Sequence, residues 1–390
     1  MTIYSSAARV GEIKIIVTGG GTGGHTYPAL TTIRTIRERL ARAGAEPEIL
    51  WVGVSHGLEA KISVQNNVPF KAITTGKLRR HINVKDQLRN VADAFRIPWG
   101  VVQAIATVAK AKPDVVISTG GYVCVPVGVA AWLLRRPLVM HEQTLAVGLA
   151  NRILSRFATR ILLSHESSIE HLPEKARPKA VVTGNPIRPE VFMGQRDRAL
   201  AGYGLDPRLP LVYVTGGAQG ALQVNKMVAE VLPDLLTRAQ VLHQCGDYSY
   251  EMMRETHASL PPHLQHRYTV FPYIHDELPD VLAAADVVVA RSGAGTVAEL
   301  NALGKACVYI PLIPTQGDEQ RRTARHLADQ GAARMLAAED ATADRLRAEL
   351  IALLDDPGYR HQISEAARVH GRPDAATAVA DEVLAAAHRG

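Results

Sequence analysis

Short apolar runs alternate with longer amphipathic stretches through the first half of the chain. Residues 13–18, 48–54 and 114–118 are brief runs rich in β-branched and other apolar residues, a pattern typical of buried strands. Between the first two runs, the apolar residues from 28 to about 43 recur with the period of a helix. Strands that alternate with helices predict a parallel sheet joined by right-handed crossovers.

The same alternation begins again with a new strand at 211–214. The further strands that the pattern predicts lie at 240–244, 268–271, 285–290 and 306–310. A chain with two such series is longer than a single domain usually is, and each series can form a parallel sheet of its own. We therefore expect an α/β protein made of two doubly wound, Rossmann-like domains in tandem.

The join between these domains is predicted at 184–189, where the sequence reads Gly-Asn-Pro-Ile-Arg-Pro. One glycine and two prolines in six residues favour a turn between elements. The expected domains are 1–187 and 188–371, and the alanine-rich segment 375–387 has the spacing of a final helix. Open α/β sheets bind ligands outside the carboxyl ends of their strands, so we expect the ligands in an interdomain cleft.

A basic and amphipathic stretch covers residues 77–102. Its apolar positions recur three and four residues apart, and Pro98 interrupts them, which predicts two helices instead of one. The stretch fits either a pair of helices packed on the domain core or docking on an anionic membrane surface. The residues expected to contact a membrane are Lys77, Arg79, Arg80, Phe95 and Trp99.

Composition narrows the class of protein. The chain has 390 residues, of which 47% are hydrophobic and 21% are charged, as in a soluble globular protein large enough for two cores. The longest apolar run, 123–134, is too short to cross a bilayer, and the first twelve residues contain no secretory apolar segment, so we expect a cytoplasmic protein. A net charge of +6 without a nucleic-acid motif favours phosphorylated ligands or anionic lipid as partners, not nucleic acid.

Four glycine-rich turns each follow a predicted strand, at 19–24, 120–121, 216–220 and 293–295. Turns of this kind let backbone N–H groups and a helix N-terminus approach an anion. The first turn matches the dinucleotide-binding spacing only loosely, with no clear acid at the end of the second strand, and no turn ends in the lysine of a P-loop. The sequence thus predicts phosphate binding in two places, one in each domain.

Four charged or titratable residues near these turns or at the domain join are candidates for chemistry. His25 could act as a general base or bind a phosphate, or it could simply cap a helix. Glu299 could accept hydrogen bonds from a ribose diol, or it could be a solvated acid favoured by a helix N-terminus. Arg188 and Arg291 could each neutralise a diphosphate or belong to a salt bridge.

Several motifs follow one another along the chain in a fixed order. They are Gly20-Gly21-Thr22-Gly23-Gly24-His25, Gly120-Gly121-Tyr122, His141-Glu142-Gln143, Gly184-Asn185-Pro186-Ile187-Arg188, Gly217-Ala218-Gln219-Gly220-Ala221, and Arg291-Ser292-Gly293-Ala294 with Glu299. In this order they resemble the MurG family of peptidoglycan N-acetylglucosaminyltransferases. The resemblance extends over nearly the whole chain.

The resemblance implies a GT-B fold whose C-terminal helix, at about 372–390, crosses back to the first domain. It also implies an inverting, metal-independent transfer of N-acetylglucosamine from UDP-N-acetylglucosamine to a lipid-diphosphate acceptor, the step from lipid I to lipid II. No cofactor is expected, because the UDP-sugar is a co-substrate. The implied location is peripheral, on the cytoplasmic face of the cell membrane.

The same resemblance assigns site residues to each domain, with His25 as the expected catalytic base. The expected acceptor-binding residues are Thr22, Gly23, Gly24, His25, Gly121, Tyr122, His141, Glu142 and Thr144. The expected donor-binding residues are Arg188, Ala218, Gln219, Gly220, Ile274 (through its backbone), Arg291, Ala294, Thr296, Glu299, Gln320 and Arg321.

This sequence departs from the family pattern at Thr144, Ala218, Gly295, Arg321 and Ala324, where the family usually has Asn, Ser, Leu, Gln and Asn. Loss of an amide that binds a sugar hydroxyl would leave a buried group unpaired, at a cost of about 1–3 kcal/mol, enough to change specificity. Three alternatives therefore stay open. They are a related enzyme that glycosylates another lipid phosphate or an antibiotic precursor, a UDP-sugar epimerase on the same architecture, and a binding protein without turnover.

Overall fold

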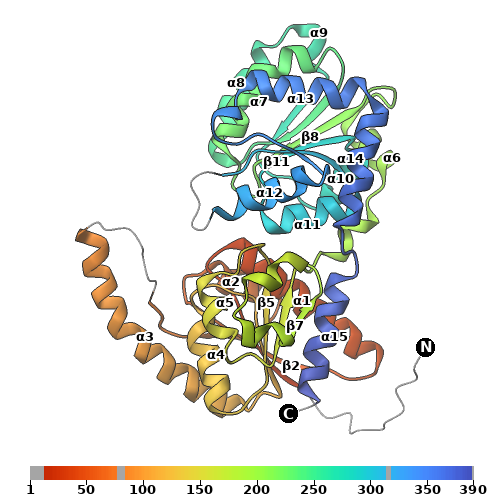
Figure 1. Ribbon diagram of the computed structural model, residues 1–390. Coiled ribbons are helices and arrows are strands. Elements are labelled where there is room, and N and C mark those ends of the chain that lie inside the picture. The colour runs from red at the N-terminus through yellow and green to blue at the C-terminus, as the bar shows by residue number, and fades with distance from the viewer. Residues whose placement is uncertain (1–12, 77–83, 313–317, 389–390) are drawn as a thin grey trace. The chain divides into compact units, whose positions relative to one another are not determined.

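The structure is a computed structural model that describes residues 13–76, 84–312 and 318–388, with the side chains of 84–95 left out. The chain folds into two compact units (Figure 1). Unit 1 is made of residues up to 186 together with those from 374 onward, and unit 2 is 187–373. The boundaries predicted from the sequence, 187/188 and 371/372, lie within two residues of these. The prediction of a two-domain α/β fold is confirmed.

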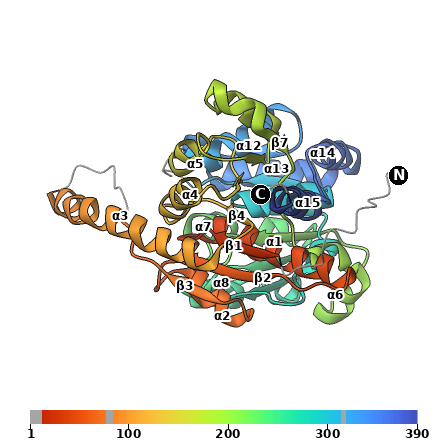
Figure 2. The ribbon, with the colours of Figure 1, turned by 90° about the horizontal axis from the view of Figure 1, so that it is seen from below.

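Unit 1 is built on a seven-stranded parallel sheet in the order β3-β2-β1-β4-β5-β6-β7. The strands are β1 (Lys14–Thr18), β2 (Glu48–Gly53), β3 (Phe70–Ala72), β4 (Val115–Ser118), β5 (Leu138–Glu142), β6 (Arg160–Leu163) and β7 (Ala180–Val182). Figure 2 shows β1, β2 and β3 side by side. The chain adds strands outward from β1 in one direction and then from β4 in the other, so the connections diverge between β1 and β4.

Helices cover both faces of this sheet because successive strand residues point to opposite sides. Ile16 belongs to the core under one set of helices, whereas Ile15 and Val17 belong to the core under the other. The first set is α3 (Val84–Ala111), α4 (Cys124–Leu133) and α5 (Leu149–Leu154). The second set is α1 (Gly23–Arg42), α2 (Leu58–Gln65) and α15 (Ala375–Ala387). The final helix α15 is therefore part of unit 1, where Asp381 pairs with Arg39 of α1.

Unit 2 contains a six-stranded parallel sheet in the order β10-β9-β8-β11-β12-β13. The strands are β8 (Leu211–Thr215), β9 (Gln240–Gln244), β10 (Tyr268–Phe271), β11 (Val287–Ala290), β12 (Ala306–Tyr309) and β13 (Arg334–Met335). The connections diverge between β8 and β11, just as they do between β1 and β4 of unit 1. The two sheets thus repeat one plan.

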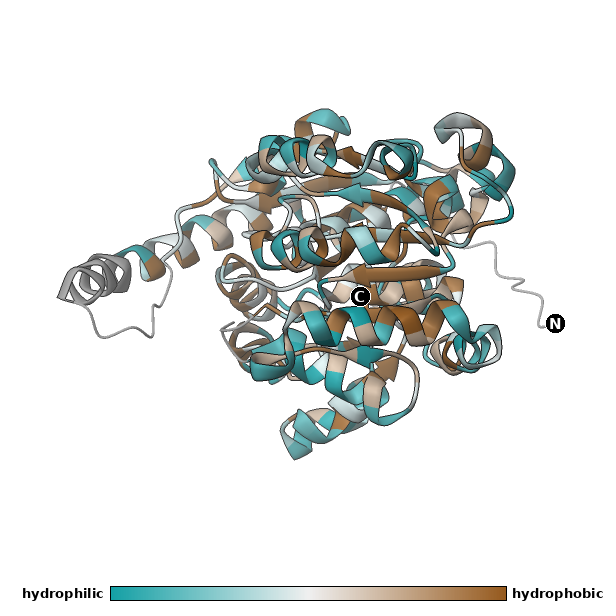
Figure 3. Cartoon of the chain, turned by 90° about the horizontal axis from the view of Figure 1, so that it is seen from above, coloured by the Kyte–Doolittle hydropathy of each residue, from teal (hydrophilic) through white to brown (hydrophobic). Residues whose placement is uncertain are grey.

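The helices of unit 2 also lie on both faces of its sheet. One face is covered by α7 (Leu222–Leu235), α8 (Tyr250–Ser259), α9 (Pro262–Gln265) and α13 (Ala343–Asp355). The other face is covered by α6 (Arg196–Tyr203), α10 (Leu278–Ala284), α11 (Ala294–Leu303) and α12 (Glu319–Asp329), and α14 (Pro357–Val369) contributes to both cores. In Figure 3, which is coloured by hydropathy, polar and apolar residues alternate along these helices.

Two predicted helix boundaries are wrong. Helix α1 begins at Gly23, five residues before the predicted start, because the carbonyl of Thr22 accepts the N–H groups of His25 and Thr26 and so closes the first turn. Helix α3 is one continuous element through Pro98, whereas the sequence predicts two. A proline within a helix removes one backbone hydrogen bond and strains the preceding turn, and this 28-residue helix continues in spite of it.

Most predicted strands agree with the structure to within two residues at each end. The clearest differences are β3, β5, β6, β7 and β13, which the pattern does not predict. Several of these are only two to four residues long, too short for a reliable period. Among the residues that the structure describes, no helix is both long and apolar enough to span a membrane.

Candidate functional site

The divergence points of the two sheets locate the candidate site. In an open α/β sheet, ligands bind at the carboxyl ends of the strands where the connections diverge. In unit 1 those ends belong to β1 and β4, and the glycine turns 19–24 and 119–122 follow them. In unit 2 they belong to β8 and β11, which lead into the turns 216–220 and 291–295. All four turns predicted from the sequence therefore lie at these carboxyl ends.

The two turns of unit 1 pack directly on each other through their backbones. The N–H of Gly20 faces the carbonyl of Gly120 at 3.4 Å, and a methyl group added to Gly121, whose φ is +90°, would clash with the carbonyl oxygen of Gly20. The turn 19–24 ends at the first residues of α1, Gly23 and Gly24. A 20-residue helix that starts at two residues without side chains offers free N–H groups to an anion.

A buried acid that the sequence analysis missed supports this turn. The carboxylate of Glu59, fully buried at the start of α2, accepts the N–H of Gly21 at 3.1 Å and the N–H of Val54 at 3.1 Å. A methyl group on Gly20, Gly53 or Gly57 would collide with this side chain. Glu59 lies six residues beyond the end of β2 and bonds to the turn itself, so it fixes the turn and is not a ribose-binding acid.

His25, the predicted base, lies half-buried in the first turn of α1. Its Nδ1 atom is 2.9 Å from the carbonyl oxygen of Thr119 and 3.1 Å from Oε1 of Gln143. Gly120 leaves room for the ring, since a methyl group there would lie 2.8 Å from Nδ1. Nε2 of His25 makes no hydrogen bond to the described part of the chain. Gln143 is a second residue whose role sequence reasoning missed: it stands in the His141-Glu142-Gln143 motif, but the motif by itself assigns no contact to it.

Three other predicted acceptor residues belong mainly to the supporting framework. His141 is fully buried, and its burial lowers its pKa to about 4, so the ring is neutral at physiological pH. The carboxylate of Glu142, also buried, accepts from the N–H and hydroxyl of Thr144, the N–H of Gly148 and the side chain of Asn151 at 2.8–3.0 Å. These groups hold the loop after β5, and contact of His141, Glu142 or Thr144 with an acceptor stays a prediction.

Tyr122 and Thr22 border the same edge. A methyl group on Gly21 would lie 3.2 Å from the Tyr122 ring, which therefore rests against the turn. Thr22 is exposed at the N-cap position of α1. Thr22, Gly23, Gly24, His25 and Tyr122 thus gather around one helix N-terminus, and their contact with an acceptor stays a prediction.

In unit 2, the turn 216–220 is held by Gln244 at the end of β9. The amide of Gln244 donates to the carbonyl of Gly217 at 3.2 Å and accepts the N–H of Ile274 at 3.0 Å. The N–H of Ile274 is thus bonded within the protein, and the expected contact of UDP with the backbone of Ile274 stays a prediction. Ala218 and Gln219 are exposed at the tip of the turn.

Arg188 and Glu299, both predicted to bind the donor, pair with each other. Nε and Nη2 of Arg188 each lie 3.0 Å from Oε1 of Glu299, so the salt-bridge alternative holds for Arg188. The Glu299 side chain is 18% exposed, and its burial raises its pKa, an effect that Arg188 partly offsets. The second carboxylate oxygen, Oε2, has no hydrogen-bond partner among the residues that the structure describes. It remains available for a ligand hydroxyl.

Arg291 follows β11 and is held by backbone carbonyls instead of an acid. Its Nη1 atom donates to Ile310 and Pro311, each at 2.8 Å. Within the described ranges no carboxylate lies in salt-bridge distance, and burial lowers the pKa of Arg291. A partly buried cation without a counter-charge favours an anionic ligand. Ala294 and Thr296 lie in the first turn of the adjacent helix α11.

The residues expected to contact the donor sugar lie on α12. Oε1 of Gln320 accepts the N–H of Leu312 at 2.9 Å, and Arg321 pairs with Asp318. Ala324 is fully buried in the core of unit 2. Its departure from the family pattern therefore changes core packing, not a group that faces a ligand.

Of the predicted membrane contacts, Lys77, Arg79 and Arg80 lie outside the described residues, as does the side chain of Phe95. Trp99 on α3 is 57% exposed. Val102, three residues further along the same helix, is also exposed.

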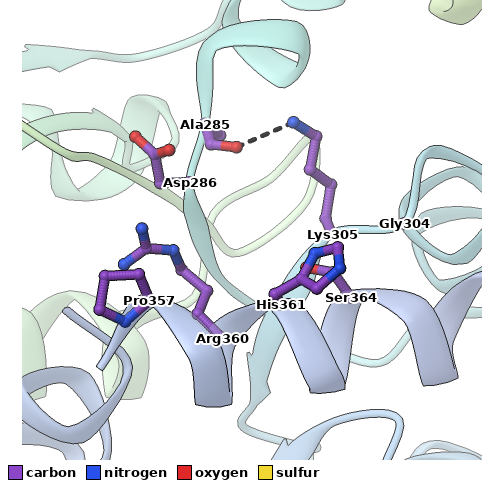
Figure 4. A pocket seen from close by; sticks show the side chains of 8 residues that line it. All are labelled: Ala285, Asp286, Gly304, Lys305, Pro357, Arg360, His361 and Ser364. Carbon is purple, nitrogen blue, oxygen red and sulfur yellow. Dashed lines mark hydrogen bonds between the residues drawn. The ribbon is translucent and has the colours of Figure 1, made fainter. Parts of the chain in front are cut away.

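Unit 2 also has a polar pocket at the opposite end of its sheet (Figure 4). Lys305 and Asp286 line it immediately before strands β12 and β11, so it is remote from the glycine turns at the carboxyl ends. Nζ of Lys305 donates to the carbonyls of Ala283 and Ala285 at the end of α10, and burial lowers its pKa to about 8. Lys305 thus caps a helix C-terminus, a structural role.

Both halves of the chain match domains of one glycosyltransferase family. Residues 15–163 match the glycosyltransferase family 28 N-terminal domain, and residues 211–379 match the glycosyltransferase family 28 C-terminal domain.

Two curated relatives share 37% of residues with this chain. One is UDP-N-acetylglucosamine–N-acetylmuramyl-(pentapeptide) pyrophosphoryl-undecaprenol N-acetylglucosamine transferase 3 of Bacillus thuringiensis (strain Al Hakam), aligned over 85% of this chain and 89% of the relative. The other is the transferase of the same name, without the number, from Listeria monocytogenes serovar 1/2a, aligned over 95% of this chain and 99% of the relative.

The crystal structure of Acinetobacter baumannii MurG is similar in fold, with a TM-score of 0.73 and 27% identity over 96% of this chain and 99% of that one. Identity above 30% over most of both sequences, together with both domain matches, is decisive for the family. The chain belongs to the MurG family of glycosyltransferases and has the GT-B fold of that family.

Proposed function

We propose that this protein transfers N-acetylglucosamine from UDP-N-acetylglucosamine to N-acetylmuramyl-(pentapeptide) pyrophosphoryl-undecaprenol, the step from lipid I to lipid II in peptidoglycan synthesis. The observation that carries the proposal is the 37% identity to a transferase of that name over 95% of the chain. Glycine turns at the carboxyl ends of both sheets agree with two phosphate-bearing substrates.

The transfer requires a base at the acceptor hydroxyl. In the proposed reaction the hydroxyl oxygen attacks the anomeric carbon of the donor sugar and loses its proton to Nε2 of His25. A bond from that oxygen to the anomeric carbon forms while the bond from the anomeric carbon to the diphosphate breaks, and UDP leaves with the configuration inverted. The position of His25 at the β1 edge, with Nδ1 engaged and Nε2 free of described partners, supports this role.

The departing diphosphate requires positive charge. We propose that Arg291, the N-terminus of α11 at Ala294 and Thr296, and the turn at Ala218, Gln219 and Gly220 supply it, in place of a metal ion. Oε2 of Glu299 would accept hydrogen bonds from the ribose, with Arg188 holding the carboxylate in place. Gln320 and Arg321 on the neighbouring helix α12 would lie beside the sugar.

The acceptor diphosphate is assigned to the N–H groups of Gly23 and Gly24 and to the turn at Gly121 and Tyr122. A dianionic group at the N-terminus of a 20-residue helix is stabilised by the helix dipole as well as by hydrogen bonds. Glu59 contributes by keeping the turn in this conformation.

A lipid acceptor lies in a membrane, so the enzyme must contact the membrane surface. Unit 1 exposes apolar side chains that could make this contact. Three helices that pack in series, α3, α4 and α5, each expose large apolar residues. These are Trp99 and Val102 on α3, Trp132 and Leu133 on α4, and Leu149 on α5. We infer that these helices, with the basic residues of 77–80, dock on an anionic membrane on its cytoplasmic side.

A vesicle assay tests the docking surface. Trp99→Ser should reduce sedimentation with phosphatidylglycerol vesicles several-fold, because Trp side chains partition into the interface. Tyr248→Ser, which changes an aromatic residue of unit 2 that is even more exposed than Trp99, is the control. Equal binding of both variants and the wild type would refute the assignment of Trp99 to the membrane surface.

Incubation with radiolabelled UDP-N-acetylglucosamine and a panel of lipid acceptors tests the reaction itself. Labelled lipid II should form only when lipid I is present. An isomerised free sugar without acceptor would instead indicate an epimerase, and transfer to another lipid phosphate alone would indicate a related biosynthetic enzyme. Either outcome would overturn the proposed substrate pair. Donor binding with no turnover on any acceptor would indicate a binding protein.

A further inference from the structure

The proton positions around His25 are set by backbone carbonyl groups. The carbonyl oxygen of Thr119 lies 2.9 Å from Nδ1 of His25 and 2.6 Å from Nε2 of Gln143. A carbonyl oxygen only accepts, so Nδ1 of His25 carries a hydrogen, and the end of the Gln143 amide near Thr119 is its NH₂ group. The other end, Oε1, then lies 3.1 Å from Nδ1 of His25 and accepts from it.

A second carbonyl fixes the far side of Gln143. Nε2 of His141 lies 2.9 Å from the carbonyl oxygen of Gly184, so this nitrogen also carries a hydrogen. In the neutral ring Nδ1 of His141 must then accept, and it does so from the second N–H of Gln143 at 3.0 Å. Every polar atom of the Gln143 amide has a partner, and only this assignment satisfies both carbonyls.

We propose that Gln143 is a positioning residue that holds His25 as its Nδ1–H tautomer, leaving Nε2 without a proton and able to act as the base. Gln143 does not need to touch either substrate. The inference depends on the proposed function only for what Nε2 then does, because the tautomer follows from the hydrogen bonds alone.

A neutral orienting group suits this site. In serine proteases a buried aspartate orients the catalytic histidine and also stabilises its charged form. An amide gives the same orientation without adding a negative charge beside a site assigned to a diphosphate. His141 completes the arrangement, since its burial lowers its pKa to about 4 and keeps it an acceptor toward Gln143.

The tautomers of His25 and His141 can be measured in the wild-type protein. The full chain is labelled with ¹⁵N-histidine, and long-range ¹H–¹⁵N correlation spectra distinguish the two tautomers of each ring. The signals of His25 and His141 are identified by their loss in His25→Gln and His141→Gln. His25 should be the Nδ1–H tautomer and His141 the Nε2–H tautomer. A His25 ring with its proton on Nε2 would overturn the inference without any variant of Gln143.

Gln143→Met then separates positioning from packing. The variant keeps an unbranched side chain but removes every hydrogen bond of the amide. The Nε2–H tautomer of His25 should become populated, and kcat should fall by about 10- to 100-fold, as for a misplaced catalytic group, while both KM values change by less than about threefold. Unchanged tautomers or an unchanged kcat in a folded variant would contradict the role of Gln143.

Gln240→Met is the matched control. Gln240 is another buried glutamine, and its amide bonds both the N–H and the carbonyl of Asp206 at the far end of the unit 2 sheet. The Gln240→Met variant should be less stable than the wild type, with an unchanged kcat and unchanged His25 signals. The proposed function can fail separately: full turnover in His25→Ala would remove His25 as the base, whereas the tautomer measurements would still decide the role of Gln143.

Discussion

The carboxyl edges of the two sheets follow the same backbone plan but collect different side chains. At the β1–β4 edge of unit 1, the side chains that surround His25 are neutral hydrogen-bonding groups, Gln143 and His141. At the β8–β11 edge of unit 2 they are charged, with Arg291 and the pair Arg188–Glu299. The side chains of the unit 1 edge are suited to handling a proton, and those of the unit 2 edge to binding negative charge.

The carboxylates of unit 1 sharpen the contrast. Glu59 and Glu142 are as buried as any core residue, but donors from the backbone and from neutral side chains satisfy them. In unit 2, by contrast, Arg291 keeps its charge unmatched within the described part of the chain. A buried charge without a partner is costly, so its presence favours a ligand that brings the opposite charge.

Removal of the imidazole should have the largest effect. In His25→Ala, kcat should fall by about 10²- to 10⁴-fold, the usual contribution of a general base, with the donor affinity unchanged. Steady-state kinetics and calorimetric titration with UDP measure the two quantities. His171→Ala, an exposed histidine of the same unit, should behave as the wild type. A large loss of UDP affinity in His25→Ala would break the division between the edges.

Loss of the unmatched cation should come next. Arg291→Ala should weaken UDP binding by roughly 10- to 150-fold, since a hydrogen bond to a charged group contributes about 1.5–3 kcal/mol. Titration calorimetry gives the affinity directly. The control is Arg208→Ala, an arginine of unit 2 that is 86% exposed and pairs with Asp206. Equal affinity in Arg291→Ala and in the control would remove Arg291 from the donor site.

The ribose acceptor should show a smaller change. Glu299→Ala should weaken UDP binding by about tenfold, because one set of hydrogen bonds is lost while the released Arg188 can still face the diphosphate. The same variant should affect UDP more than inorganic diphosphate, which has no ribose. If both ligands lose affinity equally, Glu299 acts through the charge of the site and not through the sugar.

The smallest effect on activity is expected from Glu59→Gln. The amide presents a donor where the backbone N–H of Gly21 or Val54 needs an acceptor, which should lower the free energy of unfolding by about 1–3 kcal/mol. Urea unfolding measures this free energy, and Glu46→Gln, which changes an exposed glutamate, is the control. The KM for lipid I should rise more than the KM for the donor. A stability equal to that of the wild type would show that the carboxylate is not needed to hold the turn.

The fold was predictable because its signals are local. Short apolar strands, helical spacing and glycine turns recur in both halves, and each depends on neighbouring residues only. The differences arose where tertiary contacts decide. Helix α3 continues through Pro98 although the sequence predicts a break there, and α1 starts early because Thr22 closes its first turn.

The candidate site was predictable only in part, for a related reason. His25, Arg291 and Glu299 stand beside glycine motifs and carry reactive or charged groups, so the sequence points to them. Gln143 stands in a motif and Glu59 in none, and the role of each comes from partners 24 and 38 residues away, which the sequence does not reveal. The occupied N–H of Ile274 likewise depends on Gln244, thirty residues earlier in the chain.

The last helix has a consequence for how the protein is made. Val379, Ala380 and Val383 of α15 cover the same core as Ile15 and Val17, so this core cannot be completed until α15 has left the ribosome. Unit 2 is continuous in sequence and can complete its core before then. During synthesis the beginning of the chain is therefore the part that finishes late, and we expect nascent chains that stop before α15 to expose this apolar surface to chaperones.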